Sequence, residues 1–167
     1  EQQHENLDQS SRVQAVCDFF GPSDFLKMQA DSLPNSPIQH DAKDSPEAKL
    51  IGGAVQEYPD KVAKANPISY ITKDDPPFLI VHGDQDPIVP WQQSQYLFDA
   101  LNAAEIANVF LHLVKGAGHG FNNNQEVQTL VERFFDEQLK SRSSETRSDP
   151  GALLDAPVAV PEHLRAL

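Results

Sequence analysis

Two aspartates and a histidine follow successive apolar runs in this sequence, and their types suit proton-transfer chemistry. Asp84 and Asp86 lie just after the apolar run 77–82, and His119 follows the run 108–114 with a glycine on each side. An imidazole titrates near neutral pH, so a histidine oriented by a carboxylate can take a proton from a hydroxyl group. The flanking glycines let the backbone turn sharply and leave the imidazole unobstructed. Aspartate followed by histidine is also the second half of the Ser…Asp…His order of one class of hydrolases.

Strands and helices that alternate along the chain would bring these residues together. Residues 77–82 are continuously apolar, as in a parallel strand buried on both faces, and 108–114 predict a second such strand. Helices are predicted over 90–103 and over 127–139, where apolar residues recur every three or four positions. A further strand is predicted over 13–20, before a Gly-Pro pair. This order predicts an α/β sheet, whose working residues lie beyond the C-terminal ends of the strands.

The segment 24–70 between the first two strands is predicted to be a lid-like insertion with short helices. Ser23 or Asp24 is the candidate cap of one helix, and Ser45 begins another that stops at the pair Gly52-Gly53. A third helix is predicted over 59–65. The insertion either walls a pocket and selects the substrate or simply covers the sheet edge, and the sequence favours neither.

The two ends of the chain differ in character from this central part. Residues 1–12 are polar and predict an N-terminal loop of a truncated domain, 13–140 carry the α/β pattern, and 141–167 predict a disordered tail. The first residue is a glutamate rather than a methionine, as if the chain were cut from something longer. A secreted or periplasmic location would require a signal peptide upstream, so the compartment stays open, as does the oligomeric state.

Composition narrows the range of partners. The 167 residues carry a formal net charge of −12, which disfavours binding to nucleic acid because an acidic surface repels phosphates. No apolar run approaches the roughly 20 residues of a membrane-spanning helix. The single cysteine, Cys17, has no partner for an internal disulfide and is interpreted as a small buried hydrophobic residue.

Several short motifs, each weak alone, together carry a family resemblance. They are Val16-Cys-Asp-Phe-Phe-Gly-Pro-Ser-Asp-Phe25, Leu50-Ile-Gly-Gly53, Asn66-Pro-Ile-Ser-Tyr-Ile71, Asp75-Pro-Pro-Phe-Leu-Ile-Val-His-Gly83, Asp86-Pro-Ile-Val-Pro90 and Gly116-Ala-Gly-His-Gly-Phe121. Across 11–139 the chain resembles the C-terminal half of bacterial α/β-hydrolase esterases of the feruloyl and acetyl-xylan esterase-like group. This group is related to lipases and to prolyl oligopeptidase-like hydrolases.

The resemblance implies a three-layer α/β-hydrolase fold, here incomplete, with the C-terminal strands and helices of a mostly parallel sheet. By the same resemblance Asp86 matches the acid of a Ser-His-Asp triad, His119 matches its base, and Asp84 would shape the turn. The implied activity is that of a serine carboxylic-ester hydrolase that forms an acyl-enzyme, with no metal and no organic cofactor. Its substrate would be a small-molecule or polysaccharide-linked ester, with acetyl, feruloyl and short acyl groups all open.

The nucleophile of this family is not in the sequence. No Gly-x-Ser-x-Gly occurs in the chain, and the resemblance puts that turn upstream, about 20–35 residues before Glu1. The oxyanion-hole segment would lie further upstream, so the chain alone is expected to be inactive. Two alternatives stay open: a prolyl oligopeptidase-like serine peptidase, and a non-catalytic hydrolase-fold fragment.

Ser23 and Ser94 are poor substitutes for the missing nucleophile. Ser23 lacks the flanking elbow glycines and is predicted to cap a helix, and Ser94 lies within a helix. Among the other histidines, His82 is predicted to bond backbone groups in its turn, and His112 to pack within its strand. No specific role is expected for His4, His40 and His163. The acidic residues Asp41, Asp44, Asp60, Asp74 and Asp75 lack the spacing of a calcium loop and predict a solvated face.

Overall fold

Three parallel strands form the centre of the molecule. The computed structural model describes residues 9–121 and 123–145, and its strands are β1 (Val16–Phe19), β2 (Phe78–Gly83) and β3 (Val109–Val114). They are ordered β1-β2-β3, so β2 is central, with Val81 opposite Phe19 on one side and His112 on the other. All three carboxyl ends therefore lie at one edge of the sheet, where the sequence predicts the working residues.

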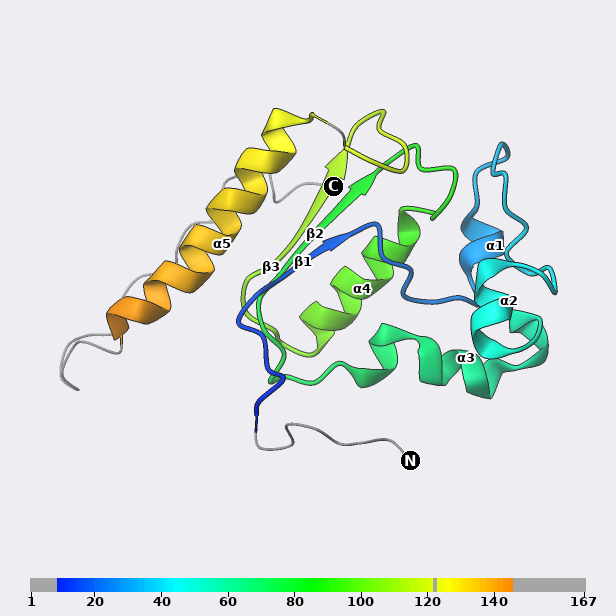
Figure 1. Ribbon diagram of the computed structural model, residues 1–167, viewed down its shortest axis with the longest axis horizontal. Coiled ribbons are helices and arrows are strands. Elements are labelled where there is room, and N and C mark those ends of the chain that lie inside the picture. Colours follow the sequence, from blue (N-terminus) through cyan, green and yellow to red (C-terminus); the bar gives the residue numbers. More distant parts are fainter. Residues whose placement is uncertain (1–8, 122, 146–167) are drawn as a thin grey trace.

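One long helix covers each face of the sheet, so that the described residues form three layers. Helix α4 (Gln92–Ala103) lies on one side of the strands and α5 (Gln125–Glu145) on the other (Figure 1). Neighbouring residues of β2 point to opposite faces: Ile80 packs with residues of α4, whereas Leu79 and Val81 pack with residues of α5. This double burial explains the continuously apolar sequence of the strand.

The segment between β1 and β2 folds into short helices with a core of their own. These are α1 (Met28–Asp31), α2 (Pro46–Ile51), η1 (Val55–Glu57), α3 (Pro59–Ala65) and η2 (Pro67–Tyr70), and they lie beside the sheet (Figure 1). The core of this insertion contains Phe25, Met28, Ile51, Val55 and Val62, joined by Val89 from the loop after β2. The insertion is thus packed directly onto the loop that carries Asp86.

Local capping signals gave the right ends for α2 and α3. The Ser45 side chain accepts a hydrogen bond from the Ala48 amide at 3.0 Å, and Gly52 ends α2 in the left-handed conformation with φ 81°. Helix α3 has the bounds 59–65 that the sequence predicts. The cap predicted at Ser23 or Asp24 is wrong, because α1 begins later, at Met28, without a side-chain cap.

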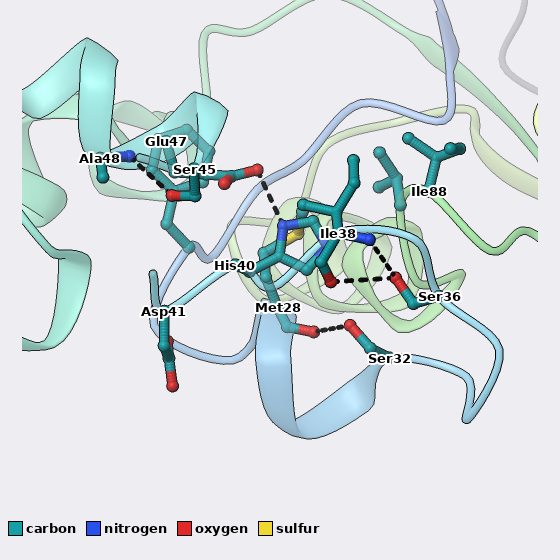
Figure 2. Close-up of polar contacts among 12 residues, drawn as sticks. Met28, Ser32, Ser36, Ile38, His40, Asp41, Ser45, Glu47, Ala48 and Ile88 are labelled. Atoms are coloured by element: carbon teal, nitrogen blue, oxygen red, sulfur yellow. Dashed lines mark hydrogen bonds and ion pairs between the residues drawn. The ribbon is translucent and has the colours of Figure 1, made fainter. Parts of the chain in front are cut away.

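His40 is buried, although its polar loop gave no reason to expect a role. Its side chain is 1% exposed, and its Nδ1 lies 3.0 Å from Oε1 of Glu47, which is also buried (Figure 2). Among the described residues, neither the remaining ring nitrogen of His40 nor Oε2 of Glu47 has a hydrogen-bond partner. The expectation that His40 has no specific role is therefore wrong, because its pair with Glu47 connects α2 to the loop before it.

The last described helix runs further than the sequence pattern indicated. Helix α5 continues to Glu145 and so includes the first five residues of the tail predicted to start at residue 141. The rest of that predicted tail, residues 146–167, lies outside the described residues, as do residues 1–8 of the predicted N-terminal loop. No helix in the described part of the chain has the length and apolar character needed to cross a membrane.

Candidate active site

The loop after β2 holds the Asp86 carboxylate in a fixed orientation. The Asp86 amide donates to the Gly83 carbonyl at 3.2 Å, which closes a tight turn. One carboxylate oxygen, Oδ1, accepts the amides of Ile88 at 2.8 Å and Val89 at 3.0 Å. Asp86 is 1% exposed, so its second oxygen is the one left to act on a neighbouring side chain.

His119 occupies the loop after β3 and reaches that second oxygen. Its Nδ1 lies 2.7 Å from Asp86 Oδ2, and its side chain is 35% exposed. An ionised carboxylate only accepts hydrogen bonds, so the shared proton belongs to Nδ1 of the imidazole. In the neutral ring Nε2 then carries a lone pair, which is the arrangement of a general base.

Backbone contacts between the two loops fix this distance. Amides of Asp84 and Gln85 donate to the carbonyls of Val114 and Ala117 at 3.2 and 2.9 Å, and Asp84 Oδ1 accepts the Gly116 amide at 2.6 Å. Gly83 makes the close approach possible, because a Cβ there would lie 2.3 Å from the Ala117 carbonyl oxygen. Asp84 thus bonds the two loops together, a contact that was not predicted, and Asp86 is the aspartate whose carboxylate contacts His119.

The surroundings of Asp86 favour its ionised form. Burial alone would raise the pKa of this carboxyl, but hydrogen bonds from the His82 and His119 rings and from the Ile88 and Val89 amides outweigh burial. Together they lower its pKa to about 2. Asp86 is therefore a carboxylate at neutral pH, able to orient an imidazole and to stabilise its protonated form.

A second imidazole lies behind the Asp86 carboxylate. His82 is the second-to-last residue of β2, is fully buried, and has Nε2 2.9 Å from the Val89 carbonyl oxygen and 3.3 Å from Asp86 Oδ2. Its Nδ1 lies 2.6 Å from Oγ of Ser94 in the first turn of α4. The bond to loop backbone agrees with the role predicted for His82, while its contacts with Ser94 and Asp86 were not predicted.

The aromatic ring of Phe20 packs beside His119, and Phe20 was not among the site residues predicted from the sequence. Its ring centroid lies 4.3 Å from that of His119 and 5.4 Å from that of Phe121. The backbone φ of Phe20 is 47°, a costly conformation for a bulky residue. Its place directly after a strand and before Gly21-Pro22, at the edge where the site forms, was the available signal.

Neither serine considered as a nucleophile contacts His119. Ser23 is buried, and its hydroxyl donates to the Gln93 carbonyl at 2.5 Å. The hydroxyl of Ser94 is bonded to His82. Trp91 is half-buried directly before α4. Cys17 is half-buried against the α5 side of the core, and burial followed by the nearby Asp18 charge raises the pKa of its thiol to about 11.

A parallel sheet covered on both faces, with an aspartate and a histidine joined beyond its strand ends, defines an incomplete α/β-hydrolase. Residues 1–101 match the BD-FAE family, and the chain belongs to that family. Among curated proteins of Mycobacterium tuberculosis, it is 32% identical to "Esterase LipC" over 76 residues. It is 28% identical to "Probable carboxylic ester hydrolase LipM" over 153 residues, or 88% of this chain. These matches span 19% and 33% of the two relatives, so the chain corresponds to a third or less of their length.

Solved structures give the same fold. A truncated carbohydrate esterase from gut microbiota matches with a TM-score of 0.68 and 37% identity, over 78% of this chain and 44% of that one. A bifunctional GH43-CE protein of Bacteroides eggerthii matches with 0.66 and 34%, over 80% of this chain and 18% of that one. A Pyrococcus horikoshii acylaminoacyl peptidase, 22% identical with a TM-score of 0.59 over 80% of this chain and 22% of that one, shares the fold.

Proposed function

We propose that this chain supplies the acid and the base of a serine carboxylic-ester hydrolase. The observation that carries the proposal is the 2.7 Å contact between Asp86 Oδ2 and His119 Nδ1, made by residues that follow neighbouring parallel strands. Hydrogen bonds keep Asp86 ionised despite its burial, and partial exposure leaves His119 accessible to a substrate. The esterase names of the relatives support the reaction class.

In this reaction His119 acts first as a general base and then as a general acid on the same proton. Its Nε2 accepts the proton of a serine hydroxyl while the serine oxygen attacks the ester carbonyl, forming a tetrahedral intermediate. His119 then gives that proton to the departing alcohol, leaving an acyl-enzyme. A water molecule then attacks the acyl-enzyme while His119 takes its proton. His119 returns this proton to the serine oxygen as the carboxylic acid leaves. Throughout, Asp86 keeps the proton of the resting imidazole on Nδ1 and stabilises the imidazolium.

We propose that the nucleophilic serine and the oxyanion-hole amides come from a part of the whole protein outside these 167 residues. Two observations support this: the sequence has no Gly-x-Ser-x-Gly, and the buried hydroxyls of Ser23 and Ser94 are bonded to Gln93 and His82. The match to 44% of a carbohydrate esterase leaves room for such a segment. The chain by itself is then expected to hydrolyse no ester above background.

An ester is favoured over a peptide as the substrate. The relatives of at least 30% identity are named as esterases, whereas the peptidases match at 22% identity or less, a likeness that concerns the fold alone. Among esters, the carbohydrate esterases among the solved neighbours favour an acyl group carried on a sugar. Small-molecule esters of short acids should serve as probes whether or not the natural acyl group is carried on a sugar.

The test is hydrolysis of p-nitrophenyl acetate by the whole protein that contains this chain. Asp86→Asn and His119→Ala should each lower kcat by about four orders of magnitude, because the base loses its orientation or is removed. Asp99→Asn, at an exposed position of α4, is the control and should keep the wild-type rate. Full activity of His119→Ala would refute the proposal, and faster cleavage of a matched amide than of the ester would reassign the enzyme as a peptidase.

A further inference from the structure

The Asp86 carboxylate is contacted by two imidazoles, and the proposed reaction uses only one of them. Oδ2 lies 2.7 Å from Nδ1 of His119 and 3.3 Å from Nε2 of His82. His119 is partly exposed, whereas the side chains of Asp86 and His82 are fully buried. The second imidazole therefore has no access to a substrate, and whatever it does for the reaction must be done through Asp86.

The hydrogen bonds of His82 determine which of its nitrogens carries the proton. A backbone carbonyl only accepts, so the 2.9 Å contact of Nε2 with the Val89 oxygen requires a proton on Nε2. The same N–H faces Asp86 Oδ2 as a second acceptor. In the neutral ring Nδ1 is then an acceptor, and it receives the hydroxyl proton of Ser94 at 2.6 Å. The Val89 carbonyl thus selects the form of His82 that donates toward Asp86, and the Ser94 hydroxyl stabilises this form by donating to Nδ1.

We propose that His82, held by Ser94, is a positioning residue for the acid of the site. It fixes Oδ2 from behind, so that the carboxylate keeps its alignment when His119 becomes charged. The Ile88 and Val89 amides fix the other oxygen, and of the two described imidazoles that contact Asp86 it is His119 that is exposed to solvent. The inference rests on the proposed function, since it assigns a role to His82 and Ser94 in that site.

The charged groups around His82 are few among the described residues, and each belongs to the same edge of the sheet. Asp86 faces Nε2, and Asp18, near the end of β1, interacts with the ring over a longer range. Burial raises the pKa of Asp18, while the Gly21 amide and His82 lower it. The Phe20 ring stands edge-on to His82, with centroids 6.2 Å apart. A substitution at His82 should therefore change mainly the pKa of Asp86. The pKa of Asp18 should be followed in the same experiment.

Two substitutions at His82 separate positioning from simple packing. His82→Gln keeps an amide N–H near the position of Nε2, whereas His82→Asn is shorter and loses that donor. Ser94→Ala removes the hydroxyl that donates to Nδ1 and stabilises the donor form of His82. It takes away a single buried oxygen, so it should fold even where changes at His82 do not. In the whole protein, His82→Asn and Ser94→Ala should lower kcat roughly ten- to a hundredfold with little change in KM. His82→Gln should recover most of the loss.

The deciding readout is the titration of Asp86, followed by carboxyl 13C NMR in whole protein labelled at aspartate. His82→Asn and Ser94→Ala should raise the pKa of Asp86, and His82→Gln should restore it. Imidazole 15N NMR should find His82 protonated on Nε2 in the wild type. An unchanged titration of Asp86 together with unchanged kcat in Ser94→Ala would overturn the inference. These NMR readouts do not depend on turnover, so they test the His82–Asp86 contact even where the proposed esterase activity fails.

Discussion

At the scale of single residues, Asp86 combines complete burial with hydrogen bonds to both of its oxygens. Two backbone amides bind Oδ1, and two imidazoles approach Oδ2. An aspartate buried without donors would be neutral near pH 7, and a neutral acid would not hold the proton of His119 on Nδ1. The hydrogen-bond donors around Asp86 therefore determine its charge in the folded state, and this charge can be measured.

Acid unfolding should report the ionisation of Asp86. The pKa of its carboxyl is about 2 in the folded protein against an ordinary value of 3.8, so the unfolded state takes up the proton at higher pH. The contribution to stability, about 2 kcal/mol, is complete above pH 4 and is lost as the pH falls through 2. Asp86→Asn should flatten the loss of unfolding free energy between pH 4 and 2 measured by urea denaturation. An equal flattening in Asp99→Asn would contradict the assignment.

The His40–Glu47 pair should contribute more to stability than ion pairs on the surface. Removing one partner leaves the other buried without its hydrogen bond, so His40→Ala should lower the free energy of unfolding by about 3 kcal/mol. Lys43→Ala breaks the exposed pair with Glu57 and should cost under about 0.5 kcal/mol. A double-mutant cycle of His40 and Glu47 by urea denaturation should give a coupling of about 1 kcal/mol or more. Strict additivity would show that the contact stabilises nothing.

At the scale of elements, the site depends on two loops that follow β2 and β3. The Asp84 and Gln85 amides donate to carbonyls of the second segment, the Gly116 amide donates to the Asp84 carboxylate, and Gly83 leaves no room for a side chain between them. The strands bring the loops to one edge, but the contact between the loops sets the 2.7 Å distance from Asp86 to His119. A side chain at Gly83 should therefore displace His119 relative to Asp86, although the glycine itself takes no part in the reaction.

Gly83→Ala should separate the two loops. Its Cβ would lie 2.3 and 2.4 Å from the carbonyl oxygens of Ala117 and Gly118, closer than atoms in real proteins come, so the backbone of one loop must shift. We expect a loss of several kcal/mol in unfolding free energy and a shifted Nδ1–H NMR signal of His119. Gly118→Ala is the matched control: its Cβ would lie 3.8 Å from Pro87, an ordinary contact. Equal stability of the two variants would contradict this account of the loops.

The sequence predicts the elements well where the signal is local. Ser45 and Gly52 mark the ends of α2 within a few residues, and the apolar run of β2 follows from burial on both faces. Contacts between distant segments left no such signal. The burial of His40 depends on how the insertion packs, and the Ser94–His82 contact depends on how α4 is placed on β2. The conformation of Phe20 follows from neither propensity nor pattern.

At the scale of the whole molecule, the described residues form part of a larger fold. The outer edge of β1 has no paired strand among them, and Phe19 is 41% exposed next to the Phe121 ring. The chain covers 44% of a carbohydrate esterase with which it shares 37% identity. The proposed acid, Asp86, and the proposed base, His119, lie within the chain, and the proposed nucleophile lies outside it.

The most direct test is covalent labelling of the whole protein with a fluorophosphonate, followed by peptide mass spectrometry. We expect the label on one serine outside residues 1–167, and we expect His119→Ala to slow labelling by orders of magnitude. The chain of 167 residues alone should take up no label. Label on Ser23 or Ser94, or labelling at the wild-type rate without the His119 imidazole, would contradict the assignment of this chain as the acid and base half of a serine hydrolase.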